Sequence, residues 1–115
     1  MDLAEFYVAV GGDLNAIKAR LVTEERIIKF LKMFPQDTSF SELTNSMSKD
    51  VQTAFRMAHT LKGLALNLGL ENLAKTSMEL TENLRDLSFK SDSEALYEAV
   101  KKDYETVISS LTQLQ

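Results

Sequence analysis

Apolar side chains recur every three or four positions through most of this 115-residue chain. That spacing places them on one face of an α-helix, whereas a half-buried strand would show alternation at every second residue. The chain contains one Pro and four Gly, too few for a β-rich protein with many tight turns. The pattern therefore predicts an all-α fold, and no segment indicates a strand.

Long helices are expected in four segments, which are residues 23–34, 50–68, 70–88 and 92–114. Pro35 ends the first segment, because the residue before a proline avoids helical geometry. Gly69 is expected to close the second as a left-handed C-cap. Short connections place consecutive helices antiparallel, so we predict an up-and-down four-helix bundle in a single domain over residues 1–115.

Shorter helices are expected outside these four segments. Residues 2–10 and 14–20 are predicted to form two short N-terminal helices that cover one end of the bundle. Ser39 and Glu42 have the spacing of a capping box, which predicts the start of a further short helix.

Charge and composition exclude several classes of protein. The formal net charge of −4 argues against a nucleic-acid-binding protein, whose footprint is basic. The absence of Cys excludes disulfides, thiol catalysis and thiolate metal sites. The acidic start does not resemble a secretory signal, and no apolar stretch approaches the ~20 residues of a membrane-spanning helix. We therefore expect a cytoplasmic monomer with no metal site of its own.

The single histidine, His59, lies within the helix expected at residues 50–68. At about 100° per residue, Ala54, Ala58 and Leu61 define the buried side of this helix, and His59 projects about 140° away from its middle. A lone histidine in a helix most often has a structural role, but this orientation turns the imidazole toward solvent. His59 is therefore a candidate functional residue.

Lys62 and Gly63 are the neighbours of His59 one turn further along the helix. A glycine inside a helix costs about 1 kcal/mol relative to alanine, so a reason to retain Gly63 is clearance for another molecule beside the imidazole. The Lys62 ammonium group can pair with an anionic group carried on a nitrogen of His59. The three residues together indicate phosphoryl capture on the histidine ring.

The same helix lacks other parts that phosphoryl transfer requires. Such transfer needs metal ions or fixed cations around the transferring group, and the helix offers one lysine and no convergent carboxylates. We therefore predict a phosphoryl carrier without a cofactor, whose chemistry is completed by a partner, rather than an enzyme. An enzyme that uses His59 as a general base is disfavoured because no second catalytic group lies near it.

Three further residues near His59 are candidate docking residues, namely Phe55, Arg56 and Leu66. If Phe55 and Leu66 are exposed, they form an apolar patch of the kind that proteins seldom expose without a use. They could equally belong to the core of the bundle. Arg56 could face an acidic partner surface or simply be solvated, and the sequence leaves these alternatives open.

The chain contains Ala58-His59-Thr60-Leu61-Lys62-Gly63, then Gly69 six residues after Gly63, then the pair Leu73-Ala74. This series closely resembles the histidine-containing phosphotransfer (HPt) domain family of bacterial and plant phosphorelays. Gly11-Gly12-Asp13 and the segment that ends near Phe34-Pro35 also look like the first half of the family, so the resemblance covers nearly the whole chain.

The resemblance implies a role for each matching residue. His59 would be the phosphoacceptor, through its Nε2 atom, Lys62 would steady the phosphoryl oxygens, and Gly63 would give the partner access. The implied partners are receiver domains of response regulators or hybrid histidine kinases, which supply the aspartate and the Mg²⁺. Leu64, Ala65 and Leu66 are more apolar than is usual after the first glycine, so the choice of partner cannot be carried over.

Two related interpretations remain beside phosphoryl relay. One is a helical adaptor that has kept the HPt bundle and lost phosphotransfer. The other is the phosphorylated domain of a chemotaxis-type kinase, although a chain of 115 residues that starts with Met favours a free-standing module.

Overall fold

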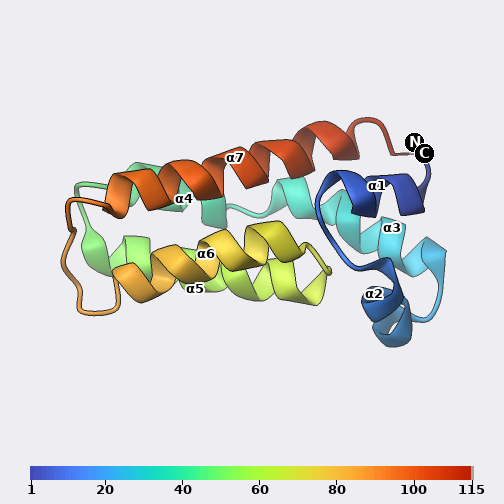
Figure 1. Cartoon of the computed structure of the whole chain (residues 1–115), viewed down its shortest axis with the longest axis horizontal. Helices are drawn as coiled ribbons and strands as arrows, with labels where there is room; N and C mark the ends of the chain where they lie inside the picture. The colour runs from blue at the N-terminus through green and yellow to red at the C-terminus, as the bar shows by residue number, and fades with distance from the viewer. Residues whose placement is uncertain (115) are drawn as a thin grey trace.

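The computed structural model describes residues 1–114, in which it contains seven α-helices, one 3₁₀ turn and no strand (Figure 1). The helices are α1 (Leu3–Ala9), α2 (Leu14–Leu21), α3 (Glu24–Met33), α4 (Ser39–Ser46), α5 (Val51–Asn67), α6 (Glu71–Asn83) and α7 (Ser93–Leu111), and the turn η1 (Phe34–Gln36) follows α3. The prediction of an all-α fold is confirmed. None of the helices within residues 1–114 has both the length and the apolar character needed to cross a membrane.

A four-helix bundle forms from α4, α5, α6 and α7, which run alternately in opposite directions (Figure 1). α5 packs against both α4 and α6, and α6 packs against α7. Aromatic side chains connect α4 with α7 and so complete the bundle. The ring centroids of Phe40 and Tyr104 lie 4.1 Å apart, and the hydroxyl groups of Thr44 and Tyr97 are 2.8 Å apart.

The first helix of the bundle differs from the prediction, which assigned this place to residues 23–34. In the structure α4 packs beside α5, while α3 packs mainly against α2. Pro35 lies in the first turn of η1, where it lacks an N–H group for a continuing helix. Asp37 is then extended and its carboxylate accepts the Ser39 N–H at 2.8 Å, so a new helix begins at Ser39.

The end of α6 is a second difference. Apolar spacing predicted a helix over residues 70–88, but α6 ends at Asn83. Leu84 is fully buried, whereas Leu87 is 44% exposed and has a left-handed backbone with φ 59°. Leu87 therefore continues the apolar spacing of the helix without belonging to the core. α7, at Ser93–Leu111, is also slightly shorter than the predicted 92–114.

Gly69 forms the reversal between α5 and α6 as predicted. Its φ is +70°, a conformation that glycine adopts without steric cost. The N–H of Gly69 donates to the Leu66 carbonyl at 3.2 Å, and the N–H of Leu70 donates to the Ala65 carbonyl at 2.9 Å. These two bonds form a Schellman C-cap, which turns α6 back along α5.

Candidate functional site

His59 lies on the exposed side of α5, nearly midway along the helix. Ala54, Ala58 and Leu61, on the opposite side of the helix, are no more than 1% exposed. The capping carboxylate of Asp50 accepts the Thr53 N–H at 3.1 Å and fixes the start of α5. The phase of the apolar residues thus holds the imidazole toward solvent, as the sequence predicts.

The space beside His59 is open at Gly63. A Cβ atom added to Gly63 would meet no other side chain and no backbone beyond its own helix within 4 Å. Gly12 offers a contrast, because a Cβ atom there would lie 2.3 Å from the Gly69 carbonyl oxygen. Packing within this chain therefore explains a glycine at position 12 but not at position 63, which supports clearance for another molecule.

The predicted docking residues fall into two groups. Phe55 is half-buried and packs against the core, while Arg56 is exposed and Leu66 is 54% exposed. The rings of Phe55 and His59 are nearly parallel at 18°, with centroids 6.5 Å apart. Phe55 therefore forms an apolar wall beside the imidazole, and Leu66 is the more accessible apolar residue on this side of α5.

The end of α6 brings an arginine and a glutamate to the same wall. The guanidinium carbon of Arg85 lies 5.4 Å from the centroid of the Phe55 ring. Arg85 also donates two hydrogen bonds to the Glu82 carboxylate, from Nη2 at 2.7 Å and from Nε at 3.1 Å. The guanidinium group is thus held beside the Phe55 ring in a two-pronged ion pair.

Electrostatic effects connect Glu82 with the residues of α5. The pKa of Glu82 lies below its usual value, mainly because Arg85 donates a hydrogen bond to it, and the charges of Arg85, Lys62 and His59 add to this lowering against a weaker opposing effect of burial. The same pair raises the pKa of Arg85. Lys62 and Arg85 therefore provide two positive groups near His59, and Glu82 provides one negative group.

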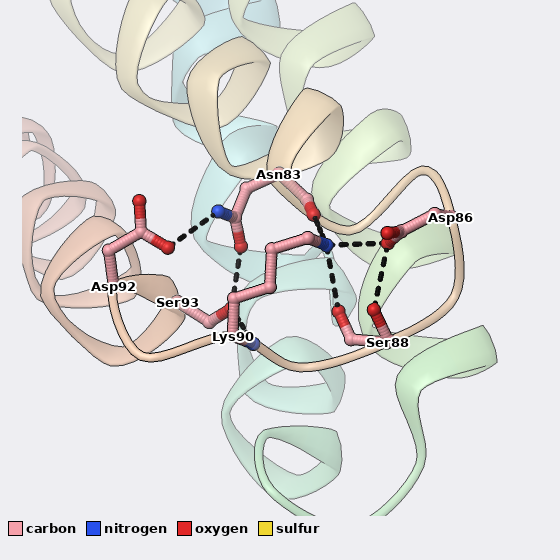
Figure 2. Close-up of polar contacts among 6 residues, drawn as sticks. All are labelled: Asn83, Asp86, Ser88, Lys90, Asp92 and Ser93. Carbon is pink, nitrogen blue, oxygen red and sulfur yellow. Dashed lines mark hydrogen bonds and ion pairs between the residues drawn. The ribbon is translucent and has the colours of Figure 1, made fainter.

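The connection between α6 and α7 is folded around Lys90. Figure 2 shows the Lys90 ammonium group between the Asn83 carbonyl, the Ser88 carbonyl and the Asp86 carboxylate, to all of which it donates hydrogen bonds. The Asn83 side chain in turn donates to Asp92 at 2.9 Å. A cation at the carboxyl end of a helix satisfies its last carbonyl groups. Lys90 thereby fixes the backbone on either side of Arg85.

Comparison with known protein families agrees with the resemblance found in the sequence. The family model of the Hpt domain matches residues 3–114. The chain belongs to the Hpt domain family. No curated protein and no solved structure matches the chain.

Two residues of the candidate site in this Hpt domain, Glu82 and Arg85, were not identified as candidates from the sequence. A signal for them did exist. In an antiparallel helix pair, residues that lie about equally far before and after the turn face each other. With the turn at Gly69, the second half of α6 has to lie opposite the part of α5 that carries His59, although only the structure shows which of its side chains reach the site.

An apolar groove of about 410 Å³ lies beside the second half of α5 in this Hpt domain. Its lining comes from α2, α3, η1 and α5, and includes Leu21, Phe30, Met33, Phe34, Leu64 and Leu68. Arg20 also lines the groove and donates a hydrogen bond to the Asn67 carbonyl at 3.2 Å. Phe30 and Met33 are 39% and 51% exposed.

Within residues 1–114 no three His, Asp or Glu side chains converge in the manner of a metal site. Three cations near His59 can bind an anion in the described part of the chain: Lys62 and Arg56 on α5, and Arg85 beside the Phe55 ring.

Proposed function

We propose that this Hpt domain carries a phosphoryl group on His59 between the aspartates of receiver domains. The observation that carries this proposal is the exposed imidazole in the middle of α5, beside the open space at Gly63. Lys62 lies one turn further along α5, and Arg85, paired with Glu82, lies beside the Phe55 ring that faces His59. An exposed nucleophilic ring, clearance for a partner and nearby cations are the features that a phosphoryl carrier needs.

The chemistry divides between this chain and its partner. A nitrogen of the neutral His59 ring attacks the phosphorus atom of a receiver's aspartyl phosphate. The N–P bond forms as the P–O bond breaks, the aspartate leaves as a carboxylate, and the other ring nitrogen keeps its proton. Lys62 and Arg85 then pair with the phosphoryl oxygens through charge-assisted hydrogen bonds. We expect the receiver to supply the aspartate and the Mg²⁺, so that this chain acts as a carrier rather than an enzyme.

The partner surface follows from the exposed residues around His59. A receiver domain that approaches over Gly63 meets the exposed Leu66 and Arg56 on α5, and the groove next to Leu64 lies further along the same helix. Such a relay partner belongs to a response regulator or a hybrid histidine kinase. We propose that the chain works as a monomer in the cytoplasm, where these partners meet it.

The test is a transfer profile against every receiver domain encoded in the source genome, each loaded with labelled phosphate. The proposal predicts acid-labile, alkali-stable label on this chain from at least one receiver, and its loss in His59→Ala. Label that persists in His59→Ala, or no label from any receiver, contradicts the proposal. An adaptor that has lost phosphotransfer would instead bind a receiver equally well with His59→Gln and take no label.

A further inference from the structure

Arg85 is already occupied in the unphosphorylated protein. Two of its N–H groups donate to the two carboxylate oxygens of Glu82, at 2.7 and 3.1 Å. A phosphoryl group presents paired oxygens that the same planar fork can bind. Arg85 therefore cannot give these two donors to Glu82 and to a phosphoryl group on His59 at the same time.

The position of the pair makes this competition relevant to His59. The Arg85 guanidinium carbon lies 5.4 Å from the Phe55 ring centroid, and the Phe55 ring lies 6.5 Å from the His59 ring. Glu82 and Arg85 are both exposed, with 59% and 56% of their side-chain surfaces accessible. No burial thus holds the guanidinium group on Glu82, and we expect rotation of the long Arg85 side chain to carry it along the Phe55 ring toward His59.

We propose that Glu82 is a positioning residue, which holds Arg85 beside Phe55 while His59 is free and releases it to the phosphoryl group when His59 is phosphorylated. This inference rests on the phosphoacceptor role of His59. Glu82 weakens the hold of Arg85 on the phosphoryl group, and therefore shifts the exchange toward onward transfer. A glutamate carboxyl is charged at neutral pH, and the pKa of Glu82 is lowered further, so the competition operates under the conditions of the relay.

Glu82→Gln removes the charge of the competitor and preserves its size. The pair is exposed to solvent, which screens its charges, so the expected effect is modest. We expect the phosphohistidine to live about threefold longer and the exchange equilibrium with a receiver to shift about threefold toward His59. Glu79→Gln is the matched control, because Glu79 is an exposed acid one turn earlier on α6 for which no ion pair is found within residues 1–114.

The experiment loads His59 with phosphoramidate, a small donor that needs no receiver, and follows phosphohistidine decay in four proteins. These are the natural chain, Glu82→Gln, Arg85→Gln and the double variant. If Glu82 acts through Arg85, Glu82→Gln slows the decay about threefold in the natural background and has no effect when Arg85 is already replaced. The NMR signal of the Arg85 Nε–H group provides a second readout, and should move when His59 of the natural chain is phosphorylated.

Two results would overturn the positioning role. One is an equal effect of Glu82→Gln with and without Arg85, since the carboxylate would then act by its charge alone. The other is an Arg85 Nε–H signal that does not respond to phosphorylation of His59. Failure of every receiver to label the chain, with normal loading by phosphoramidate, overturns the relay but not the role of Glu82, whereas failure of both donors to load His59 overturns both.

Discussion

The two helices that meet beside His59 contribute to the site in different ways. α5 presents His59, Lys62 and Gly63 from neighbouring turns of one regular helix, so their proximity follows from spacing alone. α6 contributes Glu82 from its last turn and Arg85 from just beyond its end at Asn83. Their proximity to His59 depends on the reversal at Gly69 and on the backbone bonds of the following connection. One half of the site is thus local in sequence, and the other half is tertiary.

The α5 part and the α6 part of the site are expected to have different roles. In the proposed relay, the residues of α5 provide the reactive ring, the clearance and the cation Lys62, which we expect transfer to require. We expect the residues of α6 to adjust the charge around the ring. We therefore expect substitutions on α5 to change transfer strongly, and substitutions at the end of α6 to change it moderately.

The largest effect is expected for Gly63→Leu. The added side chain occupies the open space beside His59, and a reactive approach displaced by about 1 Å can slow a reaction about a hundredfold. The fold should persist, because a Cβ atom at position 63 meets nothing within 4 Å. Transfer kinetics and circular dichroism measure the two effects, and Gly63→Ala is the smaller control. A transfer rate that Gly63→Leu leaves unchanged would show that clearance is not the reason for this glycine.

The next effect concerns the cation on α5. Lys62→Ala removes a charge-assisted hydrogen bond to the phosphoryl oxygens, a loss that corresponds to about a tenfold shorter phosphohistidine lifetime or slower transfer. Lys75→Ala removes an exposed lysine from α6 and serves as the control. Decay of labelled phosphohistidine provides the measurement. Equal phosphohistidine lifetimes in the two variants would show that Lys62 does not contact the phosphoryl group.

The docking role of α5 can be tested through Leu66, which is 54% exposed. Leu66→Glu places a charge on an apolar contact surface and should weaken receiver binding about fivefold, with a smaller effect on the lifetime of the isolated phosphohistidine. Titration calorimetry with an unphosphorylated receiver measures the affinity. Met78→Glu, at a 47% exposed position on α6, is the matched control. Equal affinities in both variants would locate the receiver elsewhere.

The folded connection after α6 is expected to have a smaller effect. Lys90→Ala removes the ammonium group that donates hydrogen bonds to Asn83, Asp86 and Ser88. The backbone around Arg85 then loses these three bonds. We expect the thermal midpoint to fall by about 3 °C and the phosphohistidine lifetime to change about twofold. Lys102→Ala, on the exposed side of α7, is the control. A normal thermal midpoint of Lys90→Ala together with normal phosphohistidine decay would mean that the Lys90 hydrogen bonds do not position Arg85.

The smallest effect is the pH dependence of the Glu82–Arg85 pair. Because the folded pKa of Glu82 is lowered, the pair stabilises the fold above the unfolded carboxyl pKa of about 4.3, and this stability is lost as pH falls through the folded value. The difference in unfolding midpoint between the natural chain and Glu82→Gln should therefore be constant from about pH 6 to 8 and shrink below about pH 4. A difference that is as large at pH 3 as at pH 7 would contradict the ion pair.

The same division between local and tertiary features explains what could be predicted from the sequence. The exposure of His59, the cap at Gly69 and the limits of α5 follow from helical spacing and cap chemistry, and all were anticipated. The identity of the first bundle helix was not anticipated. Pro35 indicates where the helix at residues 23–34 stops, but not that α4 packs beside α5 in its place. The early end of α6 was also missed, because Leu87 continues the apolar spacing although its backbone is left-handed.

The proposed relay depends on transfer of a phosphoryl group from a receiver aspartate to the exposed imidazole of His59. Its most direct test is a ³¹P NMR spectrum of the intact chain mixed with its phosphorylated receiver. We expect the acyl-phosphate signal of the receiver to decline as a phosphorus–nitrogen signal appears on this chain, and Gly63→Leu to slow this exchange without unfolding the bundle. An acyl-phosphate signal that decays only to inorganic phosphate, with every receiver of the source genome, would contradict it.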